Sequence, residues 1–173
     1  MNSFQLDECF NDRRLADRCN QEKKCLVRRW PEARSGEDDD VWFPALLTAD
    51  APILTTDFVI ALEESNRKAL PFPNTGIIVV RPDQPRPGFG SKDASAVIDK
   101  VKAIFPDWSA TDWSSAYVEF TETGAYVCDF EDEALSVGEH IPYSAASFAE
   151  KLLNALAKAK TMGYSRANLI DRN

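Results

Sequence analysis

The sequence has little histidine and cysteine and no long apolar run. His140 is the only histidine, and the four cysteines form no Cys-x-x-Cys pair, so neither a zinc ribbon nor a dithiol redox motif is indicated. No stretch approaches the roughly 18 apolar residues of a membrane span. The acidic start of the chain lacks the basic flank and apolar core of a signal peptide. We therefore expect a cytoplasmic protein with reduced thiols and no membrane association.

Familiar nucleotide-binding and hydrolase motifs are also missing. Gly88-Phe-Gly90 has neither the third glycine of a dinucleotide fingerprint nor the Gly-Lys-Ser/Thr of a P-loop, so we interpret it as a turn. No Gly-x-Ser-x-Gly elbow accompanies His140, which we expect to lie alone on the surface. A dinucleotide-binding enzyme and a Ser-His-Asp hydrolase are therefore disfavoured.

Charge is unevenly distributed along the chain. The 20 Lys and Arg residues face 28 Asp and Glu residues, and the net charge of −8 argues against binding nucleic acid through bulk positive charge. Residues 103–150 contain ten acidic and no basic side chains. We predict that this segment is an interaction surface for a basic partner, outside any nucleic-acid path. The alternative is that its hairpin only extends the sheet and exposes acids for solubility. Trp108 and Trp113 lie in this segment and are expected to pack in the core or contact a protein.

The first eighty residues alternate between strand and helix patterns. The apolar run Gly76–Val80, bounded by turn residues, is typical of a parallel strand that is covered on both faces. Asn11 is a candidate N-cap for the first helix, with Phe10 and Leu15 forming a hydrophobic staple. The predicted strands are 3–6, 25–27, 52–56 and 76–80, and the predicted helices are 12–22, one that begins within 37–40, and 58–70.

The second half of the chain predicts a loop, a helix, a hairpin and a final helix. Three prolines and two glycines predict a loop over 81–90, and Pro106 ends the helix that follows. Residues 117–121 and 125–129 alternate with a period of two around Glu122-Thr-Gly124, which indicates a hairpin. We expect an α/β core over 1–82 with a mostly parallel sheet, and an extension over 83–173 packed on the same domain.

Carboxylates follow the predicted strands at one edge of this sheet. Asp7 follows the first strand, Asp57 follows the third, and the acidic run 37–40 opens the helix that leads into the third. In a parallel sheet these positions gather at the carboxyl edge, where ligands bind. Clustered carboxylates repel one another unless they share a cation, and their hard oxygens suit Mg²⁺ or Mn²⁺, the ions of many nucleases and phosphatases. The alternative for each aspartate is a cap on a helix or turn.

These segments together resemble the PIN-like domains, in particular a small bacterial branch. The matching motifs, which cover 1 to about 82, are Phe4-Gln-Leu-Asp7-Glu8, Asn11-Asp-Arg-Arg-Leu15-Ala16, Asp38-Asp39-Asp40-Val41, Ile53-Leu-Thr-Thr-Asp57 and Gly76-Ile-Ile-Val-Val80. The resemblance implies a three-layer α/β/α fold and a carboxylate-bound Mg or Mn ion that serves hydrolysis of phosphodiester bonds in RNA. It assigns metal binding and catalysis to Asp7, to Asp39 or Asp40, and to Asp57, with Glu8 as a further candidate ligand. It also implies a toxin-type enzyme with an antitoxin-like protein partner.

One departure from the family pattern leaves two hypotheses open. The pattern often supplies a carboxylate two residues after the Asp57 position, where this chain has Val59. Glu8 or Glu63 could substitute for it, or the chain could be a catalytically silent PIN-like module that binds a protein through its acidic 103–150 region. The candidate nucleic-acid contacts Arg13, Arg14 and Arg18 are equally open. They either neutralise phosphates or pair with Asp17 and Glu22 on the first helix.

Overall fold

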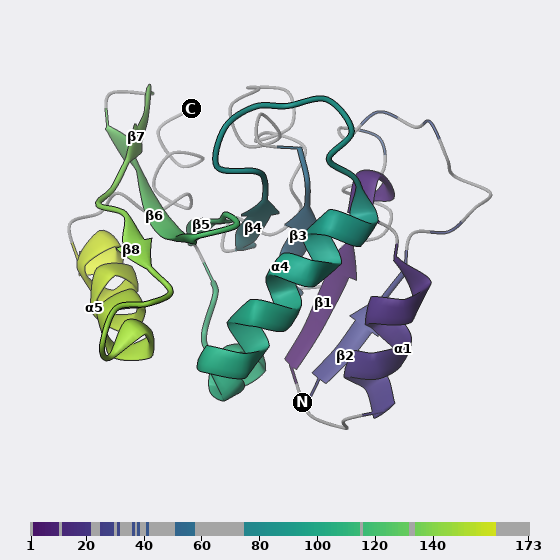
Figure 1. The fold of residues 1–173 in the computed structure, drawn as a ribbon, viewed down its shortest axis with the longest axis horizontal. Coiled ribbons are helices and arrows are strands. Elements are labelled where there is room, and N and C mark those ends of the chain that lie inside the picture. Colours follow the sequence, from purple (N-terminus) through teal and green to yellow (C-terminus); the bar gives the residue numbers. More distant parts are fainter. Residues whose placement is uncertain are drawn as a thin grey trace.

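The computed structural model describes residues 2–10, 12–21, 25–29, 31, 36, 38, 41, 51–57, 75–114, 116–131 and 134–161 (Figure 1). The described elements, in chain order, are β1 (Asn2–Leu6), the 3-10 helix η1 (Glu8–Phe10), α1 (Arg13–Gln21), β2 (Cys25–Arg28), β3 (Ile53–Thr55), β4 (Ile77–Val80), α4 (Ser91–Ile104), the 3-10 helix η3 (Pro106–Ala110), β5 (Tyr117–Phe120), β6 (Gly124–Glu131), β7 (Ala134–Val137), β8 (Ile141–Pro142) and α5 (Phe148–Thr161). The predicted helices after 37–40 and over 58–70 lie outside the described residues.

The described strands form one mixed sheet. Their order is β2-β1-β3-β4-β5-β6-β7, and β8 also pairs with β6. The first five strands in this order are parallel to one another. β6 is antiparallel to β5, β7 and β8. The expected α/β fold with a mostly parallel sheet is therefore confirmed, and so is the predicted hairpin, which pairs Val118 with Val127. Because β5 pairs with β4, the sheet continues across residue 82.

Three described helices pack on one face of this sheet. Figure 1 shows α1 and α4 over the β2 to β4 side and α5 beside β6 and β8. Their apolar side chains, such as Leu15, Ile98 and Leu152, join the core cluster beneath them. All four residues of β4 are buried, although their side chains alternate between the two faces. The expectation of a central strand covered on both faces is confirmed.

Two helix starts differ from the sequence-based predictions. The N-cap of α1 is Asp12 and not Asn11, because the Asp12 carboxylate accepts the N–H groups of Arg14 at 2.7 Å and Leu15 at 3.3 Å. Helix α4 begins at Ser91, earlier than its apolar spacing indicates, because Asp93 accepts the N–H of Gly90 at 3.0 Å and so caps a polar first turn. The predicted end of α4 before Pro106 is confirmed.

Both tryptophans of the acidic segment are core residues. Trp108 is 3% exposed and stacks on Phe4 with ring centroids 4.9 Å apart. Trp113 is 2% exposed and donates its indole N–H to the carbonyl of Trp108 at 2.8 Å. Core packing is thus the confirmed role of both rings, and neither is available to stack on a nucleobase.

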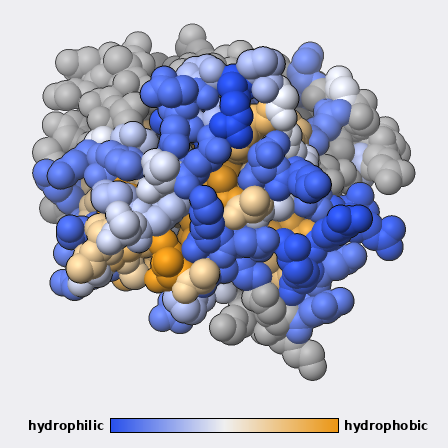
Figure 2. Space-filling model, in the orientation of Figure 1, coloured by the Kyte–Doolittle hydropathy of each residue, from blue (hydrophilic) through white to orange (hydrophobic). Residues whose placement is uncertain are grey.

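The surface is mostly polar on the face that carries α1 and α4. Figure 2 shows hydrophilic residues over most of this face, with apolar residues in patches between them. Among the described residues, the large apolar side chains that remain exposed are those of Val41, Ile104 and Leu153. The described helices include none that combines the length and apolar character needed to cross a membrane.

Candidate functional site

Asp7 lies directly after β1, at the carboxyl edge of the sheet, and its side chain is almost fully enclosed. The residue is 5% exposed. Its Oδ1 accepts the backbone N–H of Glu8 at 2.6 Å. Its Oδ2 accepts the hydroxyl of Thr55 at 2.6 Å and the thiol of Cys9 at 3.0 Å. Two donors next to it in the sequence and one from β3 therefore hold this carboxylate in one orientation.

Thr55 connects Asp7 to the second candidate carboxylate, Asp57. Its hydroxyl donates to Asp7 and accepts the backbone N–H of Asp57 at 2.9 Å. β1 and β3 are parallel neighbours, with Leu6 opposite Leu54, so both aspartates follow strands that end at the same edge. The structure thus places Asp7 and Asp57 together at the carboxyl edge, with a buried threonine between them.

The electrostatics of this edge disfavour ionised Asp7 in the absence of a cation. Burial raises the pKa of Asp7 above its usual value, and the negative charge of Asp57 raises it further, while the hydrogen bonds from Cys9, Thr55 and the Glu8 N–H act in the opposite direction. Burial and the neighbouring Asp7 also raise the pKa of Cys9 to about 11. The Cys9 thiol is therefore protonated at neutral pH, as a donor to Asp7 must be.

Among the described residues, no other carboxylate predicted for this site is directed toward Asp7 and Asp57. Asp39 and Asp40 lie outside the described part of the chain, as do Val59 and Glu63. The Glu8 carboxylate accepts the N–H of Gly36 at 2.9 Å through each of its oxygens, so its side chain is directed to another loop. Within the described residues, no group of three Asp, Glu, His or Cys side chains is arranged to hold a metal ion. The described candidate ligands are Asp7 and Asp57.

Two of the three candidate nucleic-acid arginines of α1 are engaged with acids. Arg13 lies 3.6 Å from Asp17, its partner one turn along the helix. Arg18 donates from one nitrogen to both carboxylate oxygens of Asp99 on α4, at 3.0 and 3.1 Å. The ion-pair interpretation is thus supported for Arg13 and Arg18, with Asp99 as a partner that sequence spacing could not reveal. Arg14 is exposed.

The sequence did not predict the ion pair between Arg81 and Glu119. Arg81 lies at the same carboxyl edge of the sheet as Asp7 and Asp57. Arg81, the first residue after β4, donates its Nε–H to Glu119 in the middle of β5. Glu119 is 4% exposed, and its second oxygen accepts the thiol of Cys128 at 3.2 Å. In the sequence, Glu119 occupies a polar position of an alternating hairpin strand, and that pattern predicts a solvated side chain. In the sequence, the sign of this ion pair is the single arginine, Arg81, that directly follows the apolar run 76–80.

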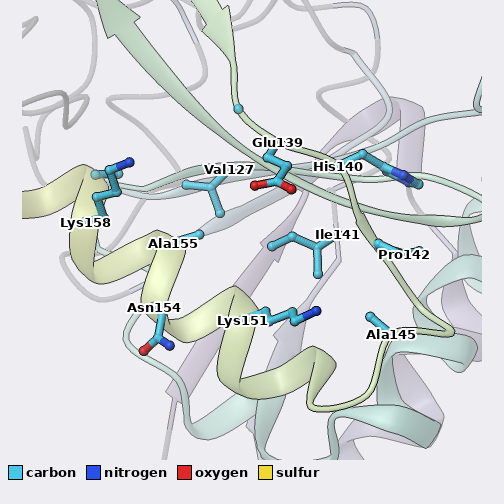
Figure 3. A pocket seen from close by; sticks show the side chains of 12 residues that line it. Val127, Glu139, His140, Ile141, Pro142, Ala145, Lys151, Asn154, Ala155 and Lys158 are labelled. Carbon is cyan, nitrogen blue, oxygen red and sulfur yellow. The ribbon is translucent and has the colours of Figure 1, made fainter.

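A hollow of about 450 Å³ lies elsewhere, between α5 and the strands β6 and β8 (Figure 3). Lys151 and Lys158 line it from α5, and Glu139 faces it from the strand side. His140 borders the hollow, but its ring is turned away and lies tilted against Tyr126, with ring centroids 4.9 Å apart. The histidine expected to lie alone on the surface is thus half-buried and in contact with an aromatic ring. None of the predicted site residues that the structure describes lines the hollow.

The Asp7 edge is the arrangement best suited to chemistry. It offers two hard carboxylates on neighbouring strands, a threonine hydroxyl between them and a fixed guanidinium one strand further along. Comparison with protein-family models, with curated proteins and with solved structures finds no match to this chain. The chemistry of this edge therefore rests on its geometry and on the motifs that form it.

Proposed function

We propose that the chain is a PIN-like, metal-dependent nuclease that hydrolyses phosphodiester bonds in RNA at the Asp7 edge. The observation that carries this proposal is the pairing of a buried, raised-pKa carboxylate with a second carboxylate on the adjacent parallel strand. Perturbed carboxylates cluster at functional sites, and ligands of open α/β sheets bind at the carboxyl edge, so both features support this assignment.

The donor set fits a small divalent cation. Mg²⁺ and Mn²⁺ prefer carboxylate oxygens, and Mg²⁺ is commonly held by only one or two carboxylates, with water in the remaining positions. Asp7 and Asp57 would supply those oxygens, and the positive charge of the cation would offset the burial and, to a lesser degree, the repulsion from Asp57 that raise the pKa of Asp7. When bound, such a cation supplies Lewis acidity toward phosphoryl oxygen.

The chain's own residues prepare this edge. The Thr55 hydroxyl and the Glu8 N–H fix the two oxygens of Asp7, so the carboxylate is oriented before any ligand arrives. Asp57 is half-buried, so its residue is partly accessible to solvent at this edge. Apolar core residues behind the edge, such as Leu6 and Leu54, exclude water from one side of the site.

The test is RNA cleavage with Mn²⁺ or Mg²⁺ and with EDTA, using wild type and Asp57→Asn. We expect cation-dependent cleavage that falls by at least about a hundredfold in the variant, because one of two charged ligands is lost. Asp17→Asn is the matched control, since it neutralises an exposed aspartate that pairs only with Arg13 among the described residues. An Asp57→Asn protein as active as the control would contradict the proposal, and so would cleavage that persists in EDTA.

A further inference from the structure

Arg81 is held from several sides at the carboxyl end of β4. Its Nε–H donates to Glu119, and its Nη1 donates to the carbonyl oxygens of Pro82 at 2.9 Å and Asp83 at 3.4 Å. Its guanidinium carbon also lies 5.4 Å from the ring centroid of Tyr126, a cation–π distance. The position of the guanidinium is thus set by the fold, without help from a ligand.

The partner of Arg81 is unusually well buried for a carboxylate. The Glu119 side chain is 5% exposed, and that of Arg81 is 21% exposed. A buried ion pair gains little net stability, because desolvation of the two charges offsets their attraction. Net stabilisation therefore gives little reason for this buried pair. A role of Glu119 in fixing the charged Arg81 guanidinium at a functional edge of the sheet gives a better one.

One end of the guanidinium is not used by the described residues. Arginine carries five N–H donors. Nε and Nη1 make all the hydrogen bonds that Arg81 forms within the described part of the chain, and none comes from Nη2. Nη2 carries two N–H donors on a planar, permanently charged group, and such donors form charge-assisted hydrogen bonds with a phosphate oxygen.

The strand register places Arg81 next to Asp57. Thr55 lies opposite Val79 in the parallel pair of β3 and β4, so Asp57 and Arg81, two residues further along, follow the two strands at equivalent positions. Figure 1 shows both strands ending at the same side of the sheet. The hydroxyl of Tyr117 is influenced by both groups: burial, Glu119, Cys128 and Asp57 raise its pKa, and Arg81 lowers it. A guanidinium therefore lies beside one of the two candidate metal carboxylates.

We propose that Arg81 is a phosphate-binding residue, in which the free Nη2 end of the guanidinium binds a non-bridging oxygen of an RNA phosphodiester beside Asp57, while Glu119 holds the other end. This inference extends the proposed function by identifying how the substrate is held. The same N–H groups would also bind free inorganic phosphate, so the experiment must distinguish an RNA phosphodiester from the free ion.

The experiment measures binding without catalysis. A fluorescein-labelled oligouridylate is titrated with protein in EDTA, and inorganic phosphate is added as a competitor in a separate arm. The variants are Arg81→Lys, which keeps the charge but loses the fork, and the double variant Arg81→Gln with Glu119→Gln, which leaves no buried charge unpaired. Circular dichroism melts verify that each variant is folded. Arg86→Gln is the matched control, because Arg86 is an exposed arginine of the same loop, paired with Glu122.

We expect both Arg81 variants to bind the oligonucleotide about tenfold more weakly, the effect of losing one hydrogen bond to a charged group, and the control to change by less than about threefold. Competition by millimolar phosphate in wild type but not in the double variant would assign the site to the phosphate group alone. Unchanged binding by a folded double variant would overturn the inference, as would an equal loss in Arg86→Gln or no binding by wild type. These outcomes do not depend on cleavage, so a failure of the nuclease proposal would be seen separately.

Discussion

The Thr55 hydroxyl at the end of β3 donates a 2.6 Å hydrogen bond to the Asp7 carboxylate after β1, which joins two parallel strands through their functional ends. The same hydroxyl accepts the N–H of Asp57. A short polar side chain, fully buried, thus holds two like-charged residues at one place. This relationship makes the geometry of the edge dependent on a residue that would bind neither metal nor RNA itself.

Thr55→Val should weaken this edge while keeping the shape of the side chain. The variant removes one of the three donors to the Asp7 carboxylate and the hydroxyl that accepts the Asp57 N–H, so we expect a loss of about 1–3 kcal/mol in the free energy of unfolding. Urea denaturation at neutral pH measures it. Thr55→Ser is the control, since it keeps the hydroxyl and loses only a methyl group, at a cost of about 1 kcal/mol. Equal losses in the two variants would show that the hydroxyl is not what holds the edge.

The raised pKa of Asp7 predicts how stability changes with pH. In the unfolded chain an aspartate titrates near its ordinary value of 3.8, while in the folded protein burial keeps Asp7 protonated to a higher pH. The contribution of Asp7 is therefore fully present below about pH 4 and is lost as the pH rises through its folded pKa. The free energy of unfolding of wild type should fall more steeply across this window than that of Asp7→Asn. Parallel slopes in the two proteins would contradict the raised pKa.

Mn²⁺ should counteract this loss. A cation that binds only the folded state raises its melting temperature, and the binding requires ionised Asp7. We expect Mn²⁺ to raise the melting temperature of wild type at pH 7, and the shift to disappear in Asp7→Asn and at a pH below the folded pKa. Differential scanning fluorimetry with EDTA and Ca²⁺ arms measures this. A shift that persists in Asp7→Asn but disappears in Asp17→Asn would place the cation elsewhere.

How far the sequence predicts this molecule differs between its fold and its site. The strand Ile77–Val80 and the end of α4 before Pro106 follow from local chemistry, and both are confirmed. The side-chain partners that Asp7 and Arg81 have on neighbouring strands are distant in sequence, at 48 residues for Thr55 and 38 for Glu119. No periodicity within a strand encodes such contacts, because they depend on strand order and register. The N-cap of α1 is Asp12 and not Asn11. Asn and Asp are about equally favourable N-caps, so the sequence alone does not choose between two such neighbours.

Cys9 should be an unreactive thiol despite its accessible position. The residue as a whole is exposed, but its sulfur faces Asp7 and lies 3.2 Å from the Thr55 hydroxyl, and its pKa is raised to about 11. The thiolate is the nucleophile, so alkylation of the folded protein by iodoacetamide at pH 8 should be about a hundredfold slower at Cys9 than in urea. Peptide mass spectrometry measures the two rates. Asp7→Asn should accelerate the folded-state rate by removing the negative charge that helps to raise the pKa of Cys9, and an unchanged rate would show that Asp7 does not suppress the thiolate.

The acidic segment 103–150 should not be part of an RNA path. Its ten acidic side chains would repel a phosphate backbone, although Glu119 and Glu122 form ion pairs with Arg81 and Arg86. Replacing Glu131, Asp132 and Glu133 by Gln, Asn and Gln should therefore leave RNA affinity unchanged or slightly raised, as measured with the labelled oligouridylate. The same variant should bind more weakly to any basic protein that copurifies with wild type, because complementary charge would be lost. A clear loss of RNA binding would place this segment in the substrate path and move the site away from Asp7.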